Sequence, residues 1–255
     1  MKVRVNEKLE ELESREAMKV LFAAESGSRA WGFESVDSDY DVRFVYVREP
    51  KWYLSVDLEK RRDVLEEPME DELDVCGWDL RKALQLLGKS NPSLYEWFSS
   101  PVVYARDAEF ERSFRPLLGA FYSPRASFYH YASMARRNER AYLRGLEVSL
   151  KKSLYVLRPL LAARWVEDHL CLPPMRFEDL LDAKLRDERV REKVDLLLEL
   201  KRSGLEMARG PRWPVLDRYV ARELDSLDAR GAKLPVAKQD RRALDALFVK
   251  ELERA

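Results

Sequence analysis

The hydrophobic pattern of the chain changes its period near residue 106, and this change constrains the fold more than any other feature. Before it, strand-like runs such as Met18–Ala24 and Tyr40–Val47 alternate with helix-like runs. After it, nearly every segment shows the three- to four-residue apolar spacing of a helix. The sequence therefore predicts an α/β domain over 1–122, followed by an all-α helical domain over 123–255.

Capping and breaking residues refine this pattern. A third strand is expected at Glu72–Trp78, after which Asp79 is placed to cap a helix, and Asn91 with Pro92 marks the start of another. The acidic stretch 57–74 is expected to form a surface loop or hairpin. The remaining helices, which glycine and proline delimit, are expected at 106–119, 124–144, 147–169, 176–204, 214–228 and 239–254.

Composition excludes several classes of protein. The apolar runs fall far short of the roughly 18 residues that a membrane helix needs, and the start of the chain lacks a signal-like apolar region, so we expect a cytoplasmic protein without a membrane segment. Cys76, Cys171, His130 and His169 are isolated from one another, which argues against disulfides and zinc sites. Basic and acidic residues balance at 46 each, so any basic surface must be local.

Two aspartates, Asp39 and Asp41, stand one residue apart where the second strand begins. Side chains alternate along a strand, so both carboxylates project to one face, where a divalent metal is the usual compensation for their repulsion. A solvated strand end is the alternative for such a pair taken alone. A calcium loop starting at Asp37 is excluded, because its glycine position is Val42 and its glutamate position is Arg48.

A Gly-Ser pair, Gly27 and Ser28, directly follows the first strand. Glycine allows backbone N–H groups to approach a phosphate without interference from a Cβ atom, and the serine hydroxyl adds a further donor. A phosphate-binding turn that faces paired carboxylates is the arrangement that two-metal phosphoryl transfer requires.

This combination resembles the nucleotidyltransferase superfamily typified by DNA polymerase β, in which a strand and Gly-Ser precede D-x-D on the next strand. Three blocks, spanning roughly residues 25–165, are similar to predicted bacterial nucleotidyltransferases associated with RNA ligases: GSRAWGFESVDSDYDVRFVYV, GWDLRKALQLLGKSNPSLYEWFSSPVVY and KKSLYVLRPLLAARWV. The resemblance implies a mixed sheet with flanking helices and a helical C-terminal half. It also implies transfer of a nucleoside monophosphate from an NTP, foremost ATP, to an acceptor hydroxyl.

The same resemblance implies a two-metal centre. Asp39 and Asp41 would hold two Mg²⁺ or Mn²⁺ ions together with a third acid on a later strand, either Asp74 or Asp79. We favour Asp74, because Asp79 already serves as a helix cap.

Contacts to the nucleotide are expected from both halves of the chain. Gly27, Ser28 and Arg29 would bind the triphosphate, although a surface ion pair is the alternative role for Arg29. From the helical half, the resemblance implies that Lys152 or Arg158 closes on the β and γ phosphates.

The acceptor is expected to bind the segment 125–158. This segment contains eight basic and two acidic residues, and tyrosines lie between the basic ones. Such a run is usually a solvated helix face, but basic and aromatic residues together suit stacked RNA bases. We expect an RNA end as acceptor, in RNA repair or processing linked to an RNA ligase. A protein or small-molecule acceptor is the alternative, since no known RNA-binding motif is present, and a non-catalytic nucleotide sensor is the alternative to an enzyme.

Overall fold

A computed structural model describes residues 1–69, 71–145, 147–203, 209–236 and 240–255. The chain divides into two compact units. The first consists of Met1–Ala30, Asp39–Tyr122 and Lys238–Ala255, and the second consists of Trp31–Ser38 and Ser123–Ala237.

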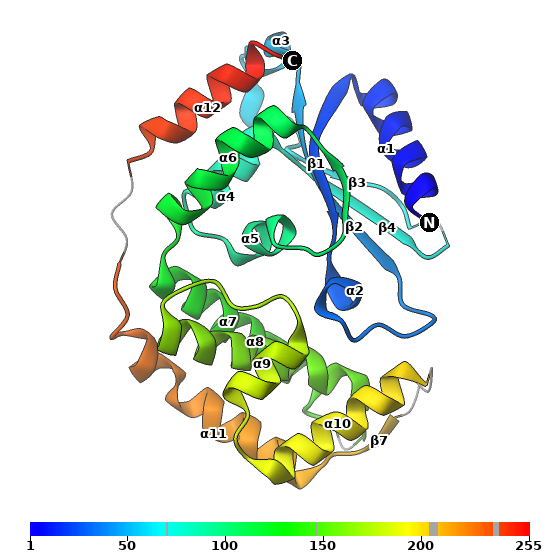
Figure 1. Cartoon of the computed structure of the whole chain (residues 1–255), viewed down its shortest axis with the longest axis vertical. Helices are drawn as coiled ribbons and strands as arrows, with labels where there is room; N and C mark the ends of the chain where they lie inside the picture. The colour runs from blue at the N-terminus through cyan, green and yellow to red at the C-terminus, as the bar shows by residue number, and fades with distance from the viewer. Residues whose placement is uncertain (70, 146, 204–208, 237–239) are drawn as a thin grey trace. The chain divides into compact units, whose positions relative to one another are not determined.

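The first unit is built on a five-stranded mixed sheet in the order β3-β4-β2-β1-β5. β2 and β4 run parallel, whereas the other neighbouring strands pair antiparallel. The strands in chain order are β1 (Met18–Glu25), β2 (Tyr40–Arg48), β3 (Val64–Glu66), β4 (Leu73–Asp79) and β5 (Val103–Arg106) (Figure 1). The sheet and its helices confirm the expected mixed α/β class.

Side-chain alternation along β1 assigns the two faces of this sheet. Ala23 lies in the hydrophobic core that α1 (Lys2–Glu16) covers with Leu9 and Leu12. The neighbouring Phe22 points to the other face and stacks on Phe98 of α5 (Pro92–Phe98), with ring centroids 4.2 Å apart. Helices therefore cover the sheet on both sides (Figure 1).

The first unit contains further short helices, and the two expected caps are confirmed. Asp79 accepts a hydrogen bond from Arg81 N at 2.8 Å, and Asn91 accepts one from Ser93 N at 3.0 Å. The acidic stretch holds a 3-10 turn and β3, which forms a hairpin with β4. The helices are α3 (Pro50–Tyr53), η1 (Leu58–Lys60), α4 (Leu80–Leu87), α5 (Pro92–Phe98), α6 (Ala108–Phe121) and α12 (Arg242–Leu252).

The two compact units differ from the expected domains in two segments. α12 contacts α4 and α6 and so belongs to the first unit, although the sequence placed it with the C-terminal helices. The segment Trp31–Ser38 belongs to the second unit, because Phe33 lies in the core of its helices. An amphipathic pattern shows that a helix is covered on one side, but it does not show by what.

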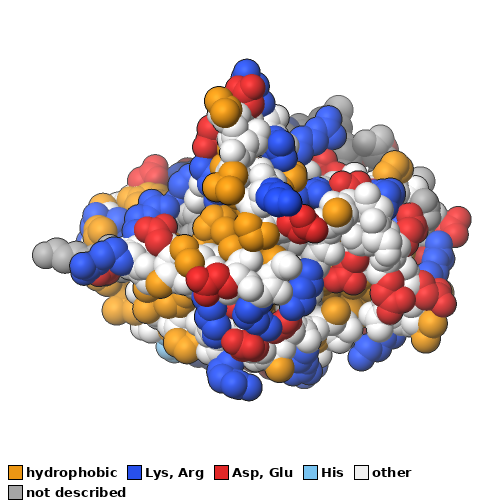
Figure 2. Space-filling model, turned by 90° about the horizontal axis from the view of Figure 1, so that it is seen from above, with side chains coloured by type: hydrophobic (Ala, Val, Ile, Leu, Met, Phe, Trp, Pro, Cys, Tyr) orange, Lys and Arg blue, Asp and Glu red, His pale blue; other side chains and the backbone are white. Residues whose placement is uncertain are grey.

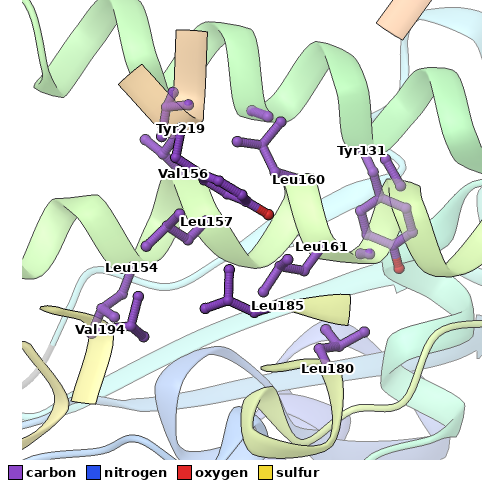
Figure 3. Close-up of a cluster of buried hydrophobic side chains, with 14 of the residues drawn as sticks. Tyr131, Leu154, Val156, Leu157, Leu160, Leu161, Leu180, Leu185, Val194 and Tyr219 are labelled. Atoms are coloured by element: carbon purple, nitrogen blue, oxygen red, sulfur yellow. The ribbon is translucent and has the colours of Figure 1, made fainter. Parts of the chain in front are cut away.

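The second unit is organised around α8, which is buried along most of its length. Figure 3 shows Leu157 and Leu161 of α8 among the buried side chains of the hydrophobic core, which also includes Leu180 and Leu185. The elements of this unit are α7 (Pro124–Tyr142), β6 (Glu147–Ser149), α8 (Leu150–His169), α9 (Phe177–Lys184), α10 (Glu188–Arg202), β7 (Arg209–Pro211) and α11 (Pro214–Gly231).

Two expected helices of this unit are corrected. The helix expected at 176–204 is two helices, because Asp187 starts α10 anew by accepting a hydrogen bond from Val190 N at 3.3 Å. The helix expected at 147–169 starts only at residue 150, because 147–149 pairs as a strand with β7. Among the described residues, no helix has the length and apolar character needed to cross a membrane.

Candidate functional site

The Gly-Ser turn lies directly against the D-x-D strand. Gly27 begins the short helix α2 (Gly27–Trp31) with a φ of +59°, and a Cβ atom placed on it would lie 1.9 Å from Oδ2 of Asp41. Only glycine fits here without displacing the carboxylate. Ser26 N also donates to the Asp41 carbonyl oxygen at 2.8 Å. The structure thus brings the Gly-Ser turn and the D-x-D motif, which are separate in the sequence, into direct contact.

A second acid, Asp74, lies beside Asp41, and an arginine joins the two. The parallel register of β2 and β4 places Asp41 opposite Asp74. Nη2 of Arg43 donates to Asp41 Oδ1 at 2.9 Å and to Asp74 Oδ2 at 2.7 Å. Burial raises the pKa of Asp41, and the charge of Arg43 offsets part of that rise. Burial opposes the charge of Arg43, but the hydrogen bond to Asp74 and the charge of Asp41 outweigh it and raise the pKa of Arg43.

A buried carboxylate, Glu25, supports the backbone at Asp41. Glu25 is 1% exposed, and its Oε1 accepts a hydrogen bond from Asp41 N at 2.8 Å. Its other oxygen accepts a hydrogen bond from the Tyr104 hydroxyl on β5. Burial raises the pKa of Glu25, while the bonds from Tyr104 and from the backbone of Asp41 lower it in part. β1, β2 and β5 are thereby joined at the end of the sheet where the motifs meet.

Asp39 and Arg29 lie next to one another at the same end. Asp39 is exposed and directly precedes β2. Arg29 Nε donates to the carbonyl oxygen of Asp39 at 3.2 Å, and its guanidinium carbon lies 3.6 Å from the centroid of the Tyr40 ring. Ser28 is only 5% exposed. The cationic head of Arg29 is therefore held beside the D-x-D motif.

The oxygen donors of this site suit a hard divalent cation. However, within the described ranges no group of three or more acidic, histidine or cysteine side chains is placed to hold a metal ion. The expected cluster of Asp39, Asp41 and Asp74 is not assembled as such, because Arg43 already binds one oxygen each of Asp41 and Asp74. The residues that fit a cation by their chemistry and position are Asp39 and Asp41.

Asp79, the other candidate for the third acid, lies towards the opposite end of β4. It is 1% exposed, pairs in register with Tyr46, and accepts a hydrogen bond from the Tyr53 hydroxyl at 2.7 Å. Burial raises the pKa of Asp79 to about 6. Asp74, not Asp79, is thus the acid beside Asp41, while a catalytic role for Asp74 stays a prediction.

The two expected phosphate ligands of the helical unit differ in exposure. Nζ of Lys152 lies 4.8 Å from the ring centroid of Tyr142 and 5.0 Å from that of Tyr155, and the side chain is half-buried. Arg158 is 2% exposed, and its guanidinium carbon lies 4.2 Å from the ring centroid of Trp31. This burial argues against the predicted contact of Arg158 with a triphosphate, whereas the role of Lys152 stays a prediction.

The basic run 125–158 does not form one exposed face. Arg125 donates to the carbonyl oxygen of Leu234 at 2.8 Å, and Arg136 pairs with Asp228 at 3.0 Å. Arg136 thereby links α7 to α11, and Arg125 links α7 to the segment that follows α11. Both arginines were expected to face an RNA acceptor.

Other members of the run do remain accessible. Arg137 and Arg140 are exposed on α7. Tyr131, expected among the stacking tyrosines, is fully buried, and the side chain of Lys151 lies outside the described part of the chain. The candidate acceptor surface is therefore smaller than the sequence predicts.

Comparison with known proteins places this chain in a family. The model of the RNA repair pathway DNA polymerase beta family (RlaP) matches residues 1–250. The chain belongs to this family. A Bacillus subtilis (strain 168) protein, the uncharacterized protein YcgL, is 44% identical over 240 residues, which cover 94% of this chain and 92% of that protein.

A solved structure is also similar to this RlaP chain, but only distantly. It is the crystal structure of a nucleotidyltransferase-like protein from Exiguobacterium sibiricum 255-15, with 10% identity and a TM-score of 0.31. The likeness covers 96% of this chain and 79% of that one. It is too weak to add to the family assignment.

Three residues of the site were not predicted: Glu25, Arg43 and Tyr104. Arg43 follows Asp41 by two positions on a strand, so the alternation that pairs the aspartates also places it on their face. Glu25 precedes the Gly-Ser turn, and its burial is visible only once β1 has a neighbour on each side. Tyr104 lies on a four-residue strand that the sequence pattern did not indicate.

Proposed function

We propose that this RlaP protein transfers a nucleoside monophosphate from an NTP, foremost ATP, to a hydroxyl at an RNA end. The observation that carries the proposal is the contact between Gly27 and the Asp41 carboxylate, which joins the turn predicted to bind phosphate to the paired acids. The family's description adds the RNA repair context.

Each residue of the site has a role in this proposal. Asp39 and Asp41 would hold a divalent cation, Mg²⁺ or Mn²⁺, which when bound neutralises charge on the phosphates. The backbone at Gly27 and Ser28 would position the triphosphate, and Arg29 would add a positive charge beside it. Lys152 is the candidate phosphate ligand from the helical unit.

The reaction forms one bond and breaks one. The acceptor oxygen attacks the α-phosphorus in line, the bond from that phosphorus to the bridging oxygen of the β-phosphate breaks, and pyrophosphate leaves with the electron pair. The acceptor proton passes to solvent. The site would accelerate this step by alignment and by charge stabilisation.

The acceptor is tested by offering each class in turn. Purified protein with Mg²⁺ and each α-labelled NTP is incubated with RNA, with a protein extract, or with a small-molecule extract. Label in RNA supports the proposal, and label only in protein or in small molecules would assign the alternative acceptor. Asp41→Asn is the control, because it keeps the size of the side chain and removes its charge.

A further inference from the structure

Arg43 is held in place by more partners than an ordinary surface ion pair provides. Besides its bonds to the Asp41 and Asp74 carboxylates, its Nη1 donates to the carbonyl oxygens of Asp74 at 3.0 Å and of Val42 at 3.1 Å. Its side chain is 18% exposed. Two carboxylates and two backbone carbonyls thus fix one guanidinium group between β2 and β4.

This guanidinium occupies the place where a cation shared by the two acids would bind. A bridging Mg²⁺ needs carboxylate oxygens from both partners at about 2.1 Å. Nη2 already lies within hydrogen-bond distance of Asp41 Oδ1 and Asp74 Oδ2. An ion that bridges these two oxygens and Arg43 in this position therefore exclude each other.

Arg43 also offsets one of the two negative charges of the pair without a shared metal ion. Asp41 and Asp74 face each other in register, so their like charges repel unless a cation lies between them. Arginine is suited to this role, because its planar fork stays charged and binds carboxylates in fixed geometry. Asp39, by contrast, is exposed, and the side chain of Asp41 remains partly accessible, at 26%.

We propose that Arg43 is a resident cation that replaces one of the two expected divalent ions. The site then binds a single divalent ion, through Asp39 and Asp41 with the phosphates of the NTP, and Asp74 positions Arg43 instead of binding metal. This inference rests on the proposed function, since it concerns the same carboxylates.

Counting bound Mn²⁺ tests the proposal without measuring activity. Full-length protein is titrated with Mn²⁺ in the presence of a non-hydrolysable ATP analogue, and free Mn²⁺ is followed by its paramagnetic resonance signal. The wild type is expected to bind one tight ion per chain. Arg43→Met is expected to bind a second ion and to gain more thermal stability from Mn²⁺ than the wild type does. Arg48→Met, which changes an arginine at the other end of β2, is the matched control and is expected to bind one.

Asp74→Asn keeps the test decisive if Arg43→Met does not fold. The proposal predicts that this variant still binds one tight Mn²⁺ ion per chain, whereas a two-ion site with Asp74 as a ligand would fall from two ions to one. Two tight ions in the wild type, an unchanged count in folded Arg43→Met, or a changed count in Asp74→Asn would each overturn the inference and leave the proposed function standing. No tight ion in the wild type would instead overturn the proposed function.

Discussion

At the scale of single residues, the site depends most on the absence of a Cβ atom at Gly27. Gly27→Ala would bring a Cβ atom to 1.9 Å from Asp41 Oδ2 at a positive φ, so the carboxylate must move. We expect a loss of about 1–3 kcal/mol in the free energy of unfolding and about 100-fold in transfer rate. Gly119→Ala is the control, because its Cβ meets nothing within 4 Å and lies inside helix α6. Equal rates for Gly27→Ala and the wild type would show that the contact does not position the carboxylate.

Asp79 is expected to make the free energy of unfolding depend on pH. Burial raises its pKa from the ordinary 3.8 to about 6. The folded state therefore holds this proton more tightly than the unfolded state, so its contribution to the free energy of unfolding falls as pH rises from about 4 to about 6. The fall is on the order of 3 kcal/mol at most.

Asp79→Asn is the variant that isolates this effect. Asparagine still caps α4 through its Oδ1, and its Nδ2 can donate to the Tyr53 hydroxyl in place of the bond that Asp79 Oδ2 accepts, but it does not ionise. Chemical denaturation at about pH 4.5 and about pH 7.5 should show the variant gaining stability relative to the wild type at the higher pH. A stability difference that does not change with pH would contradict the assigned pKa. Its transfer rate should also fall much less than that of Asp74→Asn.

At the scale of elements, sequence reasoning succeeded where local signals are strong. β1, β2 and β4 follow from alternation and β-branched residues, and the caps at Asp79 and Asn91 follow from their side-chain chemistry. The break between α9 and α10 was missed because Leu185 and the two residues after it include neither glycine nor proline. β5 was missed because four residues carry too little periodicity.

The candidate site likewise has features that a local sequence pattern predicts and features that depend on long-range contacts. The approach of Gly27 to Asp41 follows from a local motif, and the structure adds that the two are in direct contact. The hydrogen bond between Tyr104 and Glu25 depends on pairing between residues 79 positions apart, which no local pattern encodes. The burial of Arg158 likewise depends on the packing of Trp31, which belongs to the helical unit despite its place in the sequence.

At the scale of the whole molecule, the charge is balanced in total. The formal net charge is zero, and Figure 2 shows basic and acidic side chains interspersed over the face that it presents. Attraction to RNA would therefore come from particular arginines and not from a general positive field.

Arg137 and Arg140 are the arginines that carry this prediction, because both are exposed on α7. Replacing both with Ala should weaken RNA binding and flatten its dependence on salt by about 1.4 in log–log slope, about 0.7 for each phosphate contact. Arg242→Ala, an exposed arginine paired with Asp240, is the control. Weaker NTP binding with an unchanged salt slope would assign the two arginines to the nucleotide pocket and favour a different acceptor.

The most direct test of nucleotidyl transfer is to ask which phosphate of ATP reaches the acceptor. Parallel reactions with α-labelled and γ-labelled ATP, RNA and Mg²⁺ should label RNA only from the α position and release pyrophosphate. Asp41→Asn should reduce this transfer by about 100-fold or more. Label that enters RNA from the γ position, or equal transfer by the wild type and Asp41→Asn, would contradict the account.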